Sequence, residues 1–156
     1  MDQFQQQPPA NQNANYPPQG TIPRANLPTD RSFIKIFLLG LITFGIYPLI
    51  AYNSITNDVN RICTRYDNKK SMNYVLLVLV ITPLTLGIAS LVWNHNIANR
   101  VGNELRRRGA QTDFGASTFW LWSILGMFIA VGPFIYMYKF VKATNELNSL
   151  YNETGI

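Results

Sequence analysis

Few side chains in this sequence have the types and spacings needed for catalysis or metal binding. His95 is the single histidine and Cys63 the single cysteine, which excludes a multi-histidine metal site and an internal disulfide. The sequence contains neither a glycine-rich phosphate loop nor a nucleophile elbow. No two acids have the spacing of a catalytic dyad; those nearest the predicted loops are Asp58, Asp67, Glu104 and Asp113. The sequence therefore predicts a protein that is not an enzyme and uses no cofactor or metal.

A second group of polar residues falls where three apolar runs end. Asp58 and Arg100 occupy the same position after the first two runs and carry opposite charge, which favours an ion pair between them; the alternative is separate solvation. His95 could relay a proton or respond to pH, or it could bind a lipid headgroup or a backbone carbonyl. The predicted hydrogen-bond network between units consists of Asp58, His95, Asn99, Arg100 and Asn145.

The composition indicates a membrane protein. Of the 156 residues, 47% are hydrophobic and 13% are charged, about half the usual charged share of a soluble domain. The net charge of +5 is spread between the apolar runs, which argues against a nucleic-acid partner. The basic cluster Arg106, Arg107 and Arg108 is a candidate contact for anionic lipids, or else a determinant of membrane orientation.

Three apolar runs must position these groups. They cover about residues 33–52, 72–93 and 117–138, and roughly 20 residues suffice for a helix to span a hydrocarbon core. Each run contains a glycine, and a proline lies nearby, so we expect a bend at each glycine. The candidate structural motif consists of Gly45, Tyr47, Pro48, Gly87, Gly132 and Pro133.

A polar extension with a helical apolar stripe follows each run. The stripe residues recur every three to four positions, as on one face of an α-helix, and Ile97 and Val101 lie at the same offsets from Gly87 as Ile55 and Val59 from Gly45. We expect amphipathic helices along the membrane interface. The stripes are Ile55, Val59 and Ile62; Ile97, Val101 and Leu105; and Phe140, Ala143, Leu147 and Leu150.

These features divide the chain into a tail and one domain. Residues 1–28 are rich in Gln, Asn and Pro, which predicts a disordered tail. Residues 29–151 predict an all-α membrane domain of three repeated units, at about 29–66, 67–109 and 110–151. Residues 152–156 form a short polar C-terminus.

Two topologies are compatible with this pattern. If every run spans the membrane, seven basic residues lie on one side and six on the other, so the positive-inside rule selects no orientation. If each run bends at its glycine and returns, every basic loop lies on the same side. We favour three spans, because backbone groups at a lipid-exposed bend would lack hydrogen-bond partners.

Several stretches resemble a known family. They are residues 67–74, 85–88, 93–95, 99–109, 114–122 and 132–136. With these motifs the chain resembles the bacterial membrane proteins grouped as domain of unknown function 4234, over about residues 31–151. The resemblance implies a multi-pass protein of the bacterial cell membrane and supplies no activity, substrate or catalytic residue.

Two functions follow as hypotheses. The first is a non-enzymatic integral membrane protein that acts by association with membrane lipids, with a second copy of itself or with a membrane-protein partner. The alternative is a small transporter or channel subunit, assembled as an oligomer around the glycine motifs.

Overall fold

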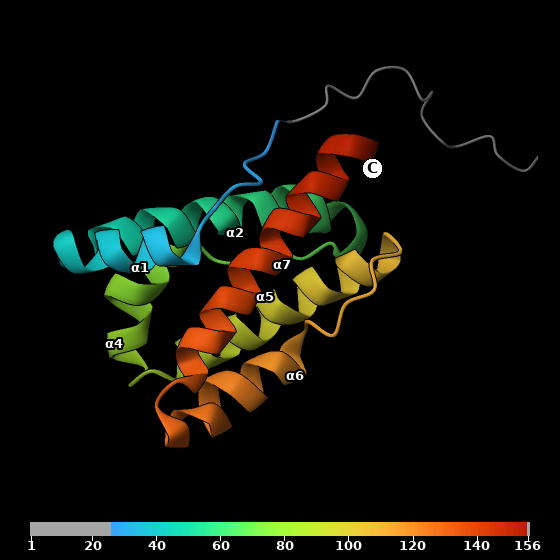
Figure 1. Ribbon diagram of the computed structural model, residues 1–156. Coiled ribbons are helices and arrows are strands. Elements are labelled where there is room, and N and C mark those ends of the chain that lie inside the picture. Colours follow the sequence, from blue (N-terminus) through green and yellow to red (C-terminus); the bar gives the residue numbers. More distant parts are fainter. Residues whose placement is uncertain (1–25, 156) are drawn as a thin grey trace, which may run out of the picture.

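The computed structural model describes residues 26–155, and this part of the chain is all-α, as predicted, with no strand. Its helices form three pairs, in each of which short apolar segments lead through a turn into a long helix (Figure 1). We call the turns at residues 43–45, 85–87 and 130–131 the three tips. The first pair is α1 (Phe33–Ile42) and α2 (Ile46–Asp67); the second is α3 (Tyr74–Leu76), η1 (Leu77–Ile81), α4 (Thr82–Leu84) and α5 (Ile88–Arg107); the third is α6 (Ala116–Thr118), η2 (Phe119–Ile124), η3 (Leu125–Ile129) and α7 (Gly132–Thr154).

The long helices α2, α5 and α7 contact one another and form the core. All three predicted stripes are buried there, each residue at most 4% exposed except the partly buried Leu150. The stripes are therefore confirmed as helical faces. They pack on each other instead of lying along a membrane interface, because three facing apolar stripes bury more surface together than each would alone.

The first two tips have the same backbone geometry. Phe44 and Gly45 have φ values of 51° and 88°, and Leu86 and Gly87 have 50° and 91°. This left-handed pair reverses the chain, and glycine adopts it without the strain that a Cβ would add. α2 and α5 each begin directly after the glycine. The predicted bends at Gly45 and Gly87 are confirmed.

The third tip differs from the prediction. Its left-handed residue is Ala130, with φ 58°, and Gly132 is instead the first residue of α7. A Cβ on Gly132 would collide with the backbone of Gly126 and with the carbonyl of Trp122. Gly132 is thus required for the close approach of α7 to η3, and the bend lies two residues earlier. Pro133 occupies the first turn of α7, where no backbone donor is needed.

None of the helices in residues 26–155 is at once long enough and apolar enough to cross a membrane. The three runs expected to span are each divided by a tip, so that the apolar residues are shared between two helices. The physical reason is the left-handed backbone at each tip, which a hydropathy average over the run does not register.

The segment before α1 is attached to α7. The predicted tail falls mostly on residues 1–25, outside the described residues, but its last residues are ordered by contacts. Leu27 is only 8% exposed, and its backbone N–H and C=O both bind the side chain of Asn152. Asn148 donates to the carbonyl of Pro28 at 2.7 Å. A prediction of disorder from local composition does not take account of these partners, which lie more than a hundred residues away in the sequence.

Candidate functional site

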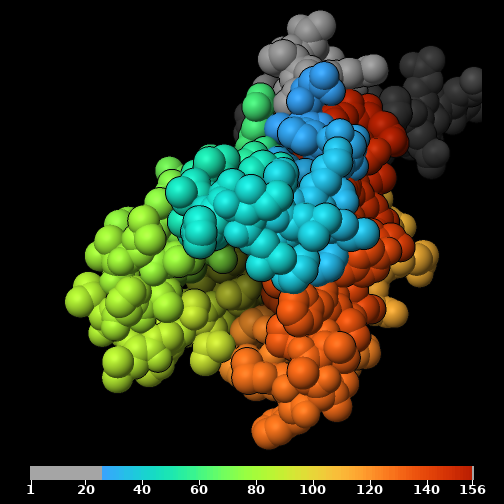
Figure 2. Space-filling model, turned by 60° about the vertical axis from the view of Figure 1, so that its left-hand side comes forward, coloured from blue at the N-terminus to red at the C-terminus, as the bar shows by residue number. Residues whose placement is uncertain are grey.

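Most of the exposed large apolar side chains lie on the three tips and on the helical segments beside them. Residues 36–57, 71–94 and 114–138 carry no charged side chain. Figure 2 shows the three tip regions, in cyan, lime green and orange, facing the viewer around a central recess. The large apolar side chains that are at least half exposed are Ile34, Leu38, Leu41, Ile42, Phe44, Ile46, Ile50, Leu79, Leu84, Leu86, Ile88, Val92, Leu121, Leu125, Met127, Phe128, Ile129, Val131 and Tyr138. We call this set the tip surface.

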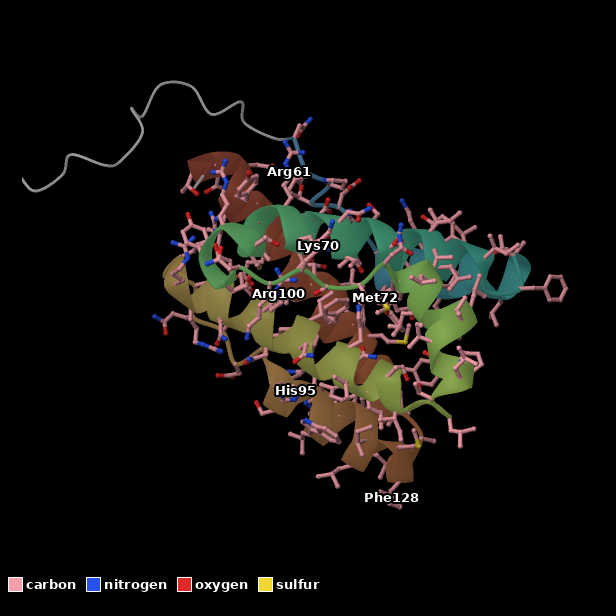
Figure 3. The ribbon with its side chains drawn as sticks, turned by 180° about the vertical axis from the view of Figure 1, so that it is seen from behind. Arg61, Lys70, Met72, His95, Arg100 and Phe128 are labelled. Carbon is pink, nitrogen blue, oxygen red and sulfur yellow. The ribbon has the colours of Figure 1, made fainter. Side chains whose placement is uncertain are left out.

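The most exposed of these residues stand at or next to the tips themselves. Phe44 is 98% exposed, Leu86 94% and Phe128 89%. In Figure 1 the first tip lies at the left and the other two at the lower left, whereas the C-terminal ends of the long helices gather at the upper right. The molecule therefore has an apolar end and a polar end. Figure 3 shows the same division, with Phe128 opposite Arg61.

The backbone N–H groups of the second tip, from Thr85 to Leu91, all have acceptors within the chain. The Thr85 hydroxyl donates to the carbonyl of Ile81 at 2.8 Å and accepts from the N–H of Ala89 at 3.1 Å. Since unpaired backbone groups are the main obstacle to placing a turn in lipid, this tip is compatible with an apolar environment.

The first tip repeats both bonds of the threonine hydroxyl at equivalent positions. Thr43 donates to the carbonyl of Leu39 at 2.6 Å and accepts from the N–H of Tyr47 at 2.9 Å. The next residue, Pro48, has no N–H to satisfy, and its ring lies against Gly40 of α1. This explains why Tyr47 and Pro48 belong to the motif. The third tip has no threonine at this place, and its Val131 donates to the carbonyl of Ile129 at 2.7 Å.

A first buried polar network joins α7, α2 and the segment before α1. Arg31 donates to Asp58 at 2.6 Å and to Ser54 at 2.9 Å. Asn148 donates to the same carboxylate oxygen of Asp58 at 3.0 Å, and Asn145 donates to the carbonyl of Arg31 at 2.7 Å. Two of the predicted network residues, Asp58 and Asn145, thus meet through Arg31. The bonds tie the third helix pair to the first.

A second network surrounds Arg100 on α5. Its guanidinium binds Asp67 through Nε at 2.5 Å and donates to Asn60, at 2.8 Å, and to the carbonyl of Lys69, at 2.7 Å. Further donations reach Ser71 and Thr64. The arginine side chain is only 7% exposed, and its contacts join α5 to the C-terminal part of α2 and to the loop that follows it.

The predicted ion pair between Asp58 and Arg100 is wrong. Asp58 pairs with Arg31 of the segment before α1, and Arg100 pairs with Asp67 at the C-terminal end of α2. His95 lies apart from both networks and accepts a hydrogen bond at Nδ1 from Trp120, at 3.0 Å. Asn99 is exposed. The five predicted residues therefore do not form one network.

The three arginines at the end of α5 bind protein groups. Arg107 and Arg108 both pair with Glu104, and Arg106 donates to Asn103 and to the carbonyl of Phe114. They lie at the polar end of the molecule, remote from the tips along α5 (Figure 1). These contacts assign them a structural role; contact with anionic lipids stays a prediction.

Nucleophilic and metal-binding groups are sparse among the described residues. Cys63 is 2% exposed, and burial raises the pKa of its thiol to about 12. Within residues 26–155 no group of three or more His, Cys, Asp and Glu side chains is arranged to hold a metal ion. The distinctive features of the described residues are the apolar tips and the basic residues near them.

Sequence reasoning missed the residues that complete the networks and the tips. No motif or spacing in the sequence marks Arg31, Asn60 or Asn148. Thr43 and Thr85 do carry a signal, since each is followed by an apolar residue and then by a tip glycine. Their hydroxyl bonds follow from that shared context.

Residues 31–103 match the model of a family described as a domain of unknown function (DUF4234). This stretch therefore carries a domain of that family, as the sequence resemblance predicts. It includes the first two tips, which share their geometry, and ends within α5. No curated protein and no solved structure matches the chain.

Proposed function

We propose that this chain is a membrane protein that inserts its three tips into one leaflet and works by association, without catalysis. The observation that carries the proposal is the near-complete exposure of Phe44, Leu86 and Phe128, at or next to turns whose backbone N–H groups largely have acceptors within the chain. An apolar surface of this extent on a folded chain is typical of a membrane or protein contact. Lipid acyl chains are the simplest partner for this surface, because they bind apolar side chains without specific polar contacts.

The length of the segments beside the tips supports insertion into a single leaflet. α1 has 10 residues, which corresponds to about 15 Å of helix. This is about half of a hydrocarbon core roughly 30 Å thick. The tips would reach the middle of the bilayer, and the core of α2, α5 and α7 would remain at the membrane surface.

Basic residues border the tip surface. Lys35, Lys139 and Lys142 are exposed near its edge. At a membrane surface each would add about 1 kcal/mol of attraction to anionic headgroups. The arrangement therefore combines an apolar anchor with a positive rim, as in proteins held at an interface.

The same interpretation extends to the repeats. We infer that the first two helix pairs are repeats of one membrane-inserting unit, since their tip bonds agree position for position. The third pair would be a divergent copy with a different turn. The lipid, a second copy of the chain or a protein partner held at the membrane would then be bound by the assembled domain.

Flotation with lipid vesicles tests the proposal. The full chain is synthesised in a cell-free system with vesicles of phosphatidylcholine and phosphatidylglycerol. We expect the wild type to float with the vesicles and the triple variant Phe44→Ser, Leu86→Ser, Phe128→Ser to lose about tenfold or more in partitioning per side chain.

The matched control is Tyr66→Ser, which removes an exposed aromatic ring near the polar end of α2. It should float like the wild type. Circular dichroism in detergent checks that the triple variant keeps its helices. A folded triple variant that floats like the wild type would overturn the proposal.

A further inference from the structure

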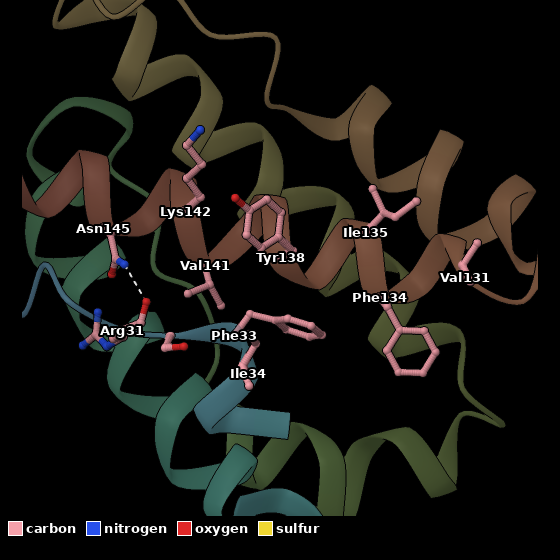
Figure 4. A pocket seen from close by; sticks show the side chains of 11 residues that line it. Arg31, Phe33, Ile34, Val131, Phe134, Ile135, Tyr138, Val141, Lys142 and Asn145 are labelled. Carbon is pink, nitrogen blue, oxygen red and sulfur yellow. Dashed lines mark hydrogen bonds between the residues drawn. The ribbon is translucent and has the colours of Figure 1, made fainter. Parts of the chain in front are cut away.

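A groove of about 700 Å³ lies between α1 and α7 (Figure 4). Arg31, Asn145 and Lys142 lie at one end of it, and Phe134 and Val131 at the other. Its volume is in the range of small-molecule sites in proteins. The groove is thus polar at one end and apolar along the rest of its length.

The polar end is basic and incompletely bonded. Arg31 uses Nη2 for Asp58 and Ser54, but its Nη1 is buried without a hydrogen-bond partner. The Oδ1 atom of Asn145 is also buried and unpaired, and Lys142 is exposed beside it. No acid lines the groove, and Arg31 is already paired with Asp58, so the positive charge left over at this end is that of Lys142. An anionic oxygen would supply an acceptor for this ammonium group.

The remaining wall is apolar and open to the outside. It is formed by Phe33 and Ile34 of α1 and by Val131, Phe134 and Ile135 around the start of α7. Ile34 is 63% exposed and Val131 54%. From Lys142 to Val131 the α7 side measures about 16 Å along the helix, which is close to half of a hydrocarbon core. One acyl chain of one leaflet fits this length.

We infer that the groove binds a single anionic phospholipid, with its phosphate beside Lys142 at the polar end and one acyl chain along the wall between α1 and α7. The inference rests on the proposed function, because a lipid enters the groove from the leaflet in which the tips sit. It adds a defined stoichiometry and a preference for negative charge, neither of which insertion of the tips requires.

Native mass spectrometry of the detergent-purified full chain tests the site. The probes are phosphatidylglycerol and phosphatidylcholine with the same two oleoyl chains. We expect the wild type to retain one phosphatidylglycerol in preference to phosphatidylcholine. Lys142→Gln should weaken phosphatidylglycerol binding about fivefold, the loss expected for one charge at the headgroup.

Lys139→Gln is the matched control, since Lys139 is an exposed lysine of the same helix that does not line the groove. Its affinity should stay at the wild-type value. Equal retention of both lipids, or an equal loss in both variants, would overturn the inference. Displacement of the lipid by millimolar inorganic phosphate would also overturn the inference, because it would show that the site binds an anion and that the acyl chain contributes nothing.

Vesicle flotation of the same variants separates this inference from the proposed function. Lys142→Gln keeps all three tips and two of the three lysines that border them, so it should still float. A chain that floats but holds no stoichiometric phosphatidylglycerol refutes the site alone. A chain that neither floats nor retains lipid refutes both.

Discussion

Arg31 and Asp58 form an ion pair at 2.6 Å that holds the segment before α1 against α2. Their side chains are 10% and 12% exposed, so the pair is nearly withdrawn from water. Asn148 of α7 binds the same carboxylate oxygen. One acid therefore connects three parts of the chain, and its loss should affect the whole assembly of helix pairs.

Asp58→Asn keeps the shape of the side chain and removes its charge. The guanidinium of Arg31 then remains buried without a counter-ion, and breaking a buried pair in this way costs about 3 kcal/mol or more. Thermal unfolding in detergent, followed by circular dichroism, should show a clear fall in Tm. Glu146→Gln changes an exposed acid of α7 and should shift stability by less than about 0.5 kcal/mol. Equal Tm values for the two variants would contradict the role of the pair.

Thr85→Val should destabilise the second tip. The substitution removes the acceptor of the Ala89 N–H at nearly constant shape, and an unpaired donor costs about 1–3 kcal/mol. Thr82→Val is the matched control, because the Thr82 hydroxyl is buried without a partner and valine in its place should be neutral or stabilising. Unfolding measurements that rank the two variants in the reverse order would refute this account of the tip.

The helix positions were largely predictable, because periodic burial is a local property. Ile55 and Ile97, for example, mark the buried faces of α2 and α5 through spacing alone, and both are fully buried. Gly45 and Gly87 likewise marked the breaks. The pattern left open whether each run bends and continues or turns back, since Phe44 and Leu86 give no sign in the sequence that they adopt a left-handed backbone.

The candidate site was less predictable, because its partners are set by how the helices cross. Arg100 does take part in a network, but its partner is Asp67, the last residue of α2, and not the predicted Asp58. Arg31 joins α7 to α2 from the segment before α1, at the start of the predicted membrane domain. Such long-range pairs depend on how the helices assemble, so no regular spacing in the sequence identifies them.

Cys63 should be nearly inert toward thiol reagents. It is buried, and with a pKa of about 12 almost no thiolate exists at pH 8. A water-soluble maleimide should therefore react at least about 100-fold more slowly with the folded wild type than with Cys63→Ala, Gln111→Cys, whose new thiol is exposed. The wild-type rate should rise with pH without a plateau up to pH 10, since the thiol stays below its pKa. Rapid labelling of the folded wild type would contradict its burial.

The loops that flank the second helix pair should lie on one side of the membrane. If each tip returns to the leaflet it entered, residues 70 and 111 remain on the same side, because residues 74–107 between them contain one tip and no crossing. Two single-cysteine variants report the side on which each loop lies: Lys70→Cys and Gln111→Cys, each combined with Cys63→Ala. Both positions are exposed in the folded chain. Labelling uses a membrane-impermeant maleimide on intact cells, with lysed cells as the accessibility control.

Both reporters should react in intact cells, or both only after lysis. Either result places the basic residues around 69–70 and 106–108 in one compartment, and this explains why a three-span count divides them almost evenly. Reaction of one reporter alone in intact cells would show that the second pair crosses the bilayer. In that case α4 and α5 would have to straighten at Gly87, the Thr85 bonds would break, and a transport path through an oligomer would become the better hypothesis.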